Sequence, residues 1–364
     1  MRGGIAHYVA LLYQKLKERG HNVRVLSFKR QYPSLLFPGK TQKDEGKELL
    51  YVDSNPLLDS INPLSWILAL LWLKKIKPDL LIFKYWMPFF APCYATLAFL
   101  SKNLMGCRII YICDNIVPHE KKIGDHILTR LGLKFVDFFI VQSQTVLKDL
   151  LTFKHDAVYR LVAHPIYEIF PPAIPKHEAK AILKIREERV LLYFGYIRAY
   201  KGLQYLIKAF PSIIEQFPVR LIICGEFYEG REETLNLIDE LNLKNTVTVC
   251  DRFIPNEEVG LYFCSADLVV LPYTSATQSG IVKVAYHYDK PVLITNVGGL
   301  PEVVPDGKSG YVVPPRNSRA LTEAALRYYK ENKEIQLTEN VKIEKKKYTW
   351  DRMAEAIEEL LHLN

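Results

Sequence analysis

The sequence has 364 residues, of which 49% are hydrophobic and 24% are charged, and its net charge is +8. These values predict a soluble globular protein of two ordinary domains. The polar, glycine-rich start lacks the features of a signal peptide. The longest uncharged stretch, residues 85–101, contains two prolines, so we interpret it as a strand end and a buried helix rather than a membrane span.

The positive charge is confined to the first half of the chain. Residues 1–173 hold 23 Lys and Arg against 14 Asp and Glu, whereas residues 174–364 hold 25 against 26. This asymmetry favours an anionic partner, such as a membrane surface, a phosphorylated acceptor or nucleic acid. An ordinary lysine-rich solvated surface is the alternative. We predict no nucleic-acid partner, because nothing but the charge favours one.

Six cysteines are scattered along the chain, mostly inside apolar runs, and none has the spacing of metal ligands. Buried, reduced thiols are therefore expected, which indicates a reducing cytosol. The sequence predicts no metal site.

The first half alternates apolar strands with helices. A helix is predicted over residues 4–19, directly after Gly3 and Gly4, and strands over 22–28, 79–86, 108–113, 137–143 and 158–164. In a βαβ unit the crossover helix follows a strand. Because this half opens on a helix, we hypothesise that its first strand is missing and that the sequence begins late. A linker is expected over the proline-rich stretch 164–180.

The second half repeats this pattern more clearly. Helices are predicted over 201–217, 231–243 and 350–363, and strands over 189–195, 219–225, 246–250, 267–272, 291–295 and 310–314. Continuous apolar strands separated by helices predict a parallel sheet covered on both faces. Both halves are therefore predicted to be doubly wound, Rossmann-like α/β domains, with ligands at the carboxyl ends of the strands.

Two segments of the second half have the composition of an anion site. Gly195 leaves one strand, and Arg198 and Lys201 precede the next helix, which suits a diphosphate. After the strand 267–272, the polar residues Gln278, Ser279 and Gly280 open another helix and could present N–H groups to a phosphate or a sugar hydroxyl. Solvated first-turn cations and ordinary helix capping are the alternatives.

Two common nucleotide-binding motifs are absent from the sequence. Neither half has G-x-G-x-x-G followed by an acidic residue, so a dinucleotide-dependent dehydrogenase is disfavoured. The glycine pair Gly298 and Gly299 does not supply that motif. No G-x-x-x-x-G-K-[ST] sequence exists, which excludes a P-loop.

Linked motifs along nearly the whole chain resemble glycosyltransferase family 4. They are "GGIAHYVALLYQKLKERGHNV", "FGYIRAYKGLQYLIKAF", "RFIPNEEVGLYFCSADLVVLPY", "NVGGLPEVVPDGKSGYVVPP" and "YTWDRMAEAIEELL". The resemblance implies a GT-B fold, with two Rossmann-like domains facing a cleft. Residues 1–172 would form the acceptor domain and 173–349 the donor domain, and helix 350–363 would pack back on the first.

The resemblance also implies transfer of a sugar from a nucleotide-sugar donor with retention, without a metal or another cofactor. Arg198 and Lys201 match the family's basic pair on the donor diphosphate, and Gly3 and Gly4 match its phosphate-approaching glycine loop. The family's Glu-x7-Glu element falls on Ala276 and Val284, neither of which is acidic. A non-catalytic GT-B protein that binds a nucleotide or a glycan therefore remains the alternative.

His119 is the candidate for the family's histidine at the donor sugar, although Cys113 or Asp114 could occupy that position. A histidine there could hydrogen-bond a sugar hydroxyl or the leaving phosphate. The expected activity is hexosyl transfer to a glycan or lipid-linked acceptor in the synthesis of a surface polysaccharide, lipopolysaccharide or glycolipid. A nucleotide-sugar epimerase fits the predicted cleft but not the motifs.

The segments 66–77 and 84–99 combine apolar, aromatic and lysine residues. They could attach the protein peripherally to an anionic inner membrane leaflet, or they could form the core of the first domain.

Overall fold

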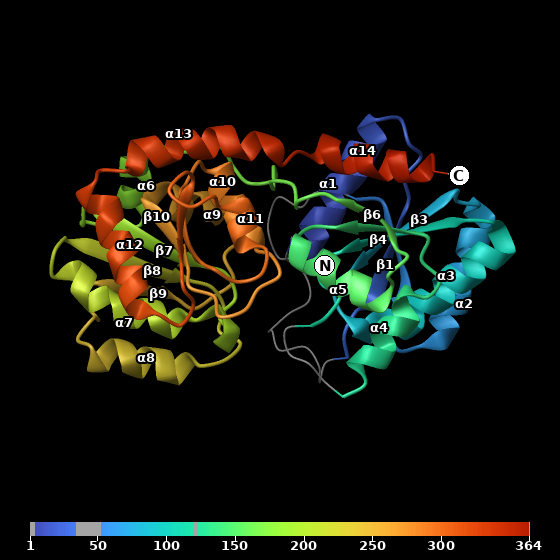
Figure 1. Cartoon of the computed structure of the whole chain (residues 1–364), viewed down its shortest axis with the longest axis horizontal. Coiled ribbons are helices and arrows are strands. Elements are labelled where there is room, and N and C mark those ends of the chain that lie inside the picture. The colour runs from blue at the N-terminus through green and yellow to red at the C-terminus, as the bar shows by residue number, and fades with distance from the viewer. Residues whose placement is uncertain (1–3, 34–51, 119–122, 364) are drawn as a thin grey trace. The chain divides into compact units, whose positions relative to one another are not determined.

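The computed structural model describes residues 4–33, 52–118 and 123–363 (Figure 1). The described chain forms two compact units. The N-terminal unit contains the residues up to His164 together with those from Trp350 onward, and the C-terminal unit runs from Pro165 to Thr349. Both are parallel α/β units of the Rossmann-like type, which confirms the predicted fold class. Gly3 and His119 lie outside the described residues.

The N-terminal unit has a two-stranded sheet, β1-β2, and a four-stranded sheet in the order β3-β4-β5-β6, and both are parallel. Buried aromatic side chains such as Phe90, Tyr111 and Phe139 form its core. Its elements are α1 (Gly4–Glu18), β1 (Val25–Arg30), β2 (Ser54–Asp59), α2 (Pro63–Ile76), β3 (Leu80–Tyr85), α3 (Ala91–Met105), β4 (Arg108–Cys113), α4 (Asp125–Leu133), β5 (Phe138–Val141), α5 (Gln144–Phe153), β6 (Val158–Leu161) and α14 (Trp350–Leu361).

Strand β2 is an element that the sequence pattern did not predict. It contains Pro56, which cannot donate a hydrogen bond to a neighbouring strand, and its first three residues are exposed. Its pairing with β1 is irregular between Ser27 and Phe28. Proline and exposure are typical of edge strands, which lack the apolar pattern that predicts a buried strand.

The last helix, α14, packs on α1 of the N-terminal unit (Figure 1). The Trp350 ring meets the buried Tyr8 ring edge-on, with 5.0 Å between centroids. At the other end of α14, Arg19 donates a 2.6 Å hydrogen bond to Glu358. The Arg108 guanidinium also donates to the carbonyl oxygen of Leu363 at 2.7 Å. These contacts fix both ends of the helix to one unit.

The C-terminal unit has a six-stranded parallel sheet in the order β12-β11-β10-β7-β8-β9. Its central strands are almost fully buried, as expected for a sheet covered on both faces. Its elements are α6 (Lys176–Ile182), β7 (Arg189–Phe194), α7 (Leu203–Ile214), β8 (Val219–Cys224), α8 (Arg231–Glu240), β9 (Val247–Cys250), α9 (Asn256–Ser265), β10 (Leu268–Leu271), α10 (Gly280–His287), β11 (Val292–Thr295), α11 (Leu300–Val303), β12 (Gly310–Val313), α12 (Ser318–Lys330) and α13 (Glu334–Glu344).

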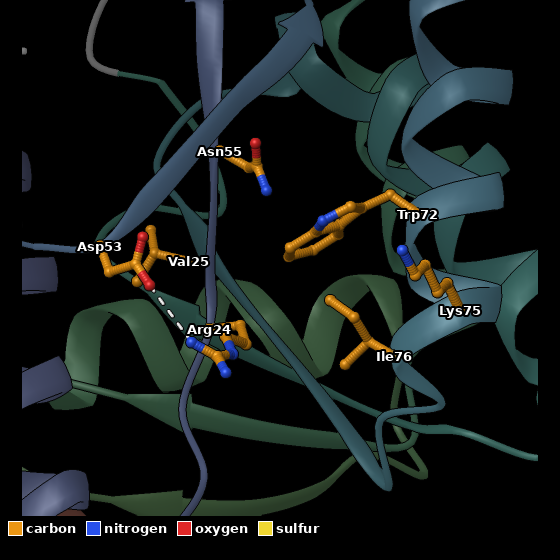
Figure 2. A pocket seen from close by; sticks show the side chains of 7 residues that line it. All are labelled: Arg24, Val25, Asp53, Asn55, Trp72, Lys75 and Ile76. Carbon is orange, nitrogen blue, oxygen red and sulfur yellow. Dashed lines mark hydrogen bonds and ion pairs between the residues drawn. The ribbon is translucent and has the colours of Figure 1, made fainter.

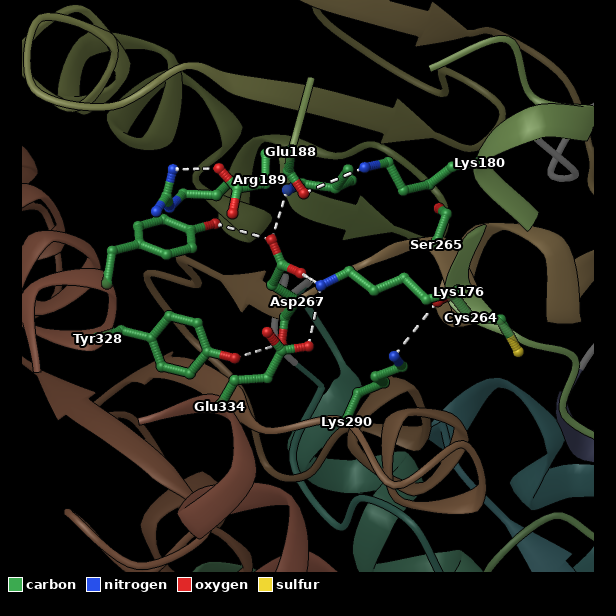
Figure 3. A network of polar contacts seen from close by, with 12 residues as sticks. Lys176, Lys180, Glu188, Arg189, Cys264, Ser265, Asp267, Lys290, Tyr328 and Glu334 are labelled. Carbon is green, nitrogen blue, oxygen red and sulfur yellow. Dashed lines mark hydrogen bonds and ion pairs between the residues drawn. The ribbon is translucent and has the colours of Figure 1, made fainter. Parts of the chain in front are cut away.

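A polar network joins the amino ends of β7 and β10 (Figure 3). The Asp267 carboxylate is buried, accepts a 2.6 Å hydrogen bond from the Val190 backbone N–H and pairs with the Lys176 ammonium. The Tyr328 hydroxyl donates to the Asp267 carbonyl oxygen at 2.9 Å. Burial raises the pKa of Asp267, and Lys176 opposes that shift. The network fixes the two strands at their amino ends, opposite to the edge where ligands are expected.

Five of the six cysteines are buried, as the sequence predicted, and Cys250 is half-buried. None of the helices in the described ranges is both long enough and apolar enough to cross a bilayer.

Candidate active site

The strand order of the C-terminal sheet reverses at β7. This strand comes first in the unit but lies between β10 and β8. Strands β8 and β9 follow on one side of it, and strands β10, β11 and β12 follow on the other side. Ligands of open α/β sheets bind at such a switch point, beyond the carboxyl ends of the strands. The loops that follow β7 and β10 carry all the predicted donor residues of this unit.

The loop after β7 depends on two glycines in left-handed backbone conformations. Gly195 has a φ of 110° and Gly202 has a φ of 65°. Residues with a side chain rarely adopt either value. A Cβ on Gly202 would overlap the carbonyl oxygen of Pro272, at the end of β10. The two loops therefore approach each other closely, and the backbone N–H of Thr274 donates to the Tyr200 carbonyl oxygen at 2.7 Å.

Lys201 lies at the centre of this arrangement. Its Nζ is 3.2 Å from the position of a Cβ on Gly195 and 5.3 Å from the centre of the Tyr273 ring. Although Lys201 as a whole is only half-buried, desolvation, together with the nearby Arg198 charge, lowers the pKa of its ammonium to about 8. Within the described ranges no carboxylate contributes to the electrostatic environment of Lys201. Its charge is thus available to an anionic ligand.

Arg198 stands beside Lys201, at the start of the short 3-10 turn Ala199–Lys201. Its guanidinium lies 5.0 Å from the centre of the Tyr228 ring. Because like charges repel, the Arg198 charge disfavours the charged form of Lys201. A bound diphosphate would neutralise both.

The loop after β10 ends at the N-terminus of α10. The Ser279 Oγ accepts a 3.3 Å hydrogen bond from the Ile281 backbone N–H, so Ser279 caps the helix. Tyr273 links the two loops, because its hydroxyl is 3.4 Å from the Ser279 Oγ and its ring faces Lys201. Sequence reasoning missed Tyr273, although its place directly after a buried strand was a usable signal.

Gln278 and Gly280 flank this cap, and both are half-buried. A Cβ on Gly280 would approach the Tyr167 ring and hydroxyl to 3.3 Å, so a glycine suits this position. The structure therefore brings the second-half candidates Gly195, Arg198, Lys201, Gln278, Ser279 and Gly280 to two adjoining loops at one sheet edge.

The positions that correspond to the Glu-x7-Glu element are occupied by buried Ala276 and Val284. Neighbouring Lys283 points into the unit, with its Nζ 3.0 Å from the centre of the Tyr348 ring, and this Nζ is buried without a hydrogen-bond partner. Desolvation therefore lowers its pKa well below the usual value. The described residues contain no His, Cys, Asp and Glu group arranged to hold a metal ion.

The N-terminal unit carries its own polar cluster at the carboxyl ends of its strands. The Nζ of buried Lys84, in β3, is 2.6 Å from the Asp114 carboxylate, which follows β4. The same Nζ lies 3.6 Å from the centre of the Tyr8 ring, and the Gln142 side chain donates to the Tyr8 hydroxyl at 3.0 Å. Gly4, the only predicted site residue described in this unit, is the exposed first residue of α1.

Two family models match consecutive parts of the chain. Residues 2–166 match the model described as Glycosyltransferase Family 4, and residues 188–331 match Glycosyl transferases group 1. An uncharacterized glycosyltransferase of Methanocaldococcus jannaschii is 28% identical over 177 residues, which are 46% of this chain and 43% of that protein. The matched region is thus less than half the length of this curated relative.

Solved structures of the same fold match more of the chain. Sucrose-phosphate synthase from Thermosynechococcus elongatus aligns with a TM-score of 0.75 and 19% identity, over 98% of this chain and 92% of that chain. HepE of Anabaena, solved with UDP, aligns with a TM-score of 0.69 and 17% identity, over 86% of each chain. At these identities the likeness establishes the fold. The two family models identify the chain as a glycosyltransferase with a Glycosyltransferase Family 4 domain followed by a Glycosyl transferases group 1 domain, and the structural likeness shows the GT-B fold.

Proposed function

We propose that this chain moves a hexosyl group from a nucleotide-sugar donor to a glycan or lipid-linked acceptor, with retention of the anomeric configuration. The observation that carries the proposal is the pair Arg198 and Lys201 at the β7 and β10 switch point, where no described carboxylate neutralises Lys201. The retaining mode rests on the family resemblance.

The difficult step is departure of the nucleoside diphosphate as positive charge develops on the sugar. Negative charge then grows on the leaving phosphate. Arg198, Lys201 and the N-terminus of α10 would stabilise that charge. Because Ala276 and Val284 supply no carboxylate, we propose attack on the same face of the sugar, assisted by the leaving phosphate itself.

UDP-sugars are the first donors to test, because HepE of Anabaena was solved with UDP and with UDP-glucose. We propose that Gly195, Gln278, Ser279 and Gly280 line the donor site, with Gly3 and Gly4 approaching the donor phosphate and His119 at the sugar. The acceptor would be an intermediate of a surface polysaccharide, a lipopolysaccharide or a glycolipid.

We propose the reducing cytosol as the compartment of this chain. The proposal rests on the cysteine pattern, because the six cysteines are scattered along the chain and five of them are buried.

Thermal unfolding with UDP, GDP, CMP and their sugars tests the donor assignment. A ligand at a hundred times its Kd stabilises the folded state by about 2.7 kcal/mol. The midpoint would then rise by roughly 2–4 °C for each kcal/mol. A rise with one nucleotide family identifies the base. No rise with any nucleotide contradicts the proposal.

Release of the nucleoside diphosphate in the presence of donor and acceptor tests the activity. Loss of one preorganised donor to a developing oxyanion costs about 2.7–4 kcal/mol, so Lys201→Met should lower turnover around a hundredfold. Lys208→Met is the matched control, because Lys208 is an exposed lysine on α7. If the nucleotide binds but is never released from its sugar, the non-catalytic alternative holds.

A further inference from the structure

Helix α2 directs its large apolar side chains away from the N-terminal unit. Leu64, Ile67, Leu68 and Leu71 are 70%, 53%, 58% and 58% exposed. Their spacing of i, i+3, i+4 and i+7 places them in one stripe along the helix. An exposed stripe of four large aliphatic residues requires an explanation beyond folding.

Small residues form the buried side of α2. Ser65 and Ala69 are buried together with Leu73, and Trp66 packs partly buried against the core of the unit. Ser65 and Trp66 also bind the end of β2, since the Asp59 backbone N–H donates to the Ser65 Oγ at 2.9 Å and the Trp66 indole donates to the Asp59 carbonyl oxygen at 2.8 Å. The rotation of the helix about its axis is therefore fixed with the aliphatic stripe outward.

Helix α12 shows the ordinary arrangement in the same protein. It buries Leu321 and Tyr328 and carries the exposed ion pairs Arg319–Glu323 and Arg327–Glu331 on its other side. The orientation of α2 is the reverse of this pattern. Residues 84–99 have a composition similar to that of residues 66–77, but they contribute buried Phe90, Cys93 and Tyr94 to the core.

The C-terminal end of α2 is basic. Lys74, Lys75 and Lys77 are exposed, and the helix contains no acidic residue. A pocket of about 320 Å³ lies at this end, between the helix and the starts of β1 and β2 (Figure 2). The Trp72 indole and Lys75 line one side of it, and Arg24, paired with Asp53, lines the other. Tryptophan and lysine beside an apolar stripe are typical of the boundary between lipid and water.

We propose that the outer face of α2, defined by Leu64, Ile67, Leu68, Leu71 and the lysines 74, 75 and 77, docks onto an anionic lipid bilayer. The helix has 14 residues and is too short to span a bilayer, so it would lie parallel to the membrane surface. The aliphatic stripe enters the boundary between headgroups and acyl chains, and the lysines meet anionic headgroups. This surface shares no residue with the proposed donor site.

A second copy of the chain fits this face less well. A two-fold interface brings the same patch from both subunits together. Because α2 has no acidic residue, such an interface would leave the lysines without a counter-charge from the facing helix. An anionic bilayer supplies that counter-charge, so charge complementarity favours lipid.

Flotation of the full chain with vesicles tests the proposal. Two kinds of vesicle are compared at low and high salt. One contains phosphatidylcholine with about 30% phosphatidylglycerol, which mimics an anionic leaflet, and the other is pure phosphatidylcholine. We expect binding to the anionic vesicles that weakens with salt. Leu68→Glu/Leu71→Glu should lower the ratio of vesicle-bound to free protein more than about tenfold, because the two leucines would no longer enter the bilayer. Lys74→Gln/Lys75→Gln/Lys77→Gln should lower it by at least about tenfold.

The matched control is Ile335→Glu/Ile343→Glu, which changes two exposed isoleucines of the C-terminal unit and should leave vesicle binding unchanged. The α2 variants should unfold at the wild-type temperature, since the changed side chains are exposed. Failure of the wild-type chain to float with anionic vesicles, or equal binding by the α2 variants, overturns the proposal. The proposal is also overturned if the wild-type chain sediments as a dimer, Leu68→Glu/Leu71→Glu abolishes that dimer, and the wild-type chain binds no vesicles. Nucleotide binding, measured on the same samples, reports separately on the proposed transferase function.

Discussion

The Lys201 ammonium lies 3.2 Å from the point where a Cβ on Gly195 would stand. Gly195 also has a φ of 110°, which only glycine adopts readily. The loop after β7 thus folds its own backbone against the cation that we assign to the donor diphosphate. A side chain at position 195 would both displace the Lys201 ammonium and strain the backbone of the turn.

Gly195→Ala should therefore weaken UDP binding by about tenfold or more, because a misplaced cation loses a charge-assisted contact of roughly 1.5–3 kcal/mol. Gly230→Ala is the control. Gly230 also has a positive φ, of 69°, but its Cβ would meet nothing closer than 4.0 Å. Titration calorimetry and thermal unfolding should find similar destabilisation in both variants and weaker binding in Gly195→Ala alone. Equal affinities for the two variants would refute the assignment.

UDP affinity should fall as pH rises through about 8. Burial lowers the pKa of the Lys201 ammonium to about 8 in the free protein, so the cation is present below that pH and is lost above it. Binding measured between pH 6.5 and 9.5 should show this dependence in the wild-type chain. Lys201→Arg should remove it, since arginine stays charged throughout. A flat wild-type profile would show that Lys201 does not contact the ligand.

Lys283→Met should raise the free energy of unfolding at pH 7. The Lys283 Nζ is buried without a hydrogen-bond partner, and desolvation holds its pKa well below the usual value. Between that lowered pKa and 10.5, the unfolded chain binds more protons, so wild-type stability should increase with pH in this window. Urea unfolding at pH 7 and 9.5 should find a smaller pH effect in Lys283→Met. Exposed Lys208→Met should change stability by no more than about 0.5 kcal/mol.

The pair Lys84 and Asp114 should behave as a coupled unit. Burial lowers the pKa of Lys84, while the Asp114 carboxylate at 2.6 Å raises it. Removing one partner of a buried pair costs about 3–5 kcal/mol, whereas apolar replacement of both is often neutral. Urea unfolding should therefore find Lys84→Met less stable than Lys84→Met/Asp114→Leu. Additive losses from the two single variants would contradict this coupling.

The sequence predicted most strands of the three described sheets, because buried parallel strands are continuous apolar runs bounded by turns. Strand β4, Arg108–Cys113, matches its prediction residue for residue. Strand β2 was not predicted, because its Pro56 and its exposed residues do not form a continuous apolar run.

The donor loops could be predicted because glycine, cations and capping residues directly follow apolar strands. Contacts that depend on three separate segments could not. Lys84, Asp114 and Tyr8 come together only when β3, β4 and α1 are folded, and nothing local marks them as partners. The two apolar segments 66–77 and 84–99 look alike in sequence, but tertiary packing leaves Ile67, Leu68 and Leu71 of the first exposed and buries most of the second. His119 and Gly3 stay predictions.

Titration of UDP into the wild-type chain, Lys201→Met and Lys208→Met at pH 7 tests the central claim most directly. Lys201 is a cation at the switch point with no carboxylate partner among the described residues, so its loss should weaken UDP binding at least about tenfold, whereas Lys208→Met should bind as the wild type does. Equal affinities of the wild type and Lys201→Met for UDP would contradict the assignment of this edge as the donor site.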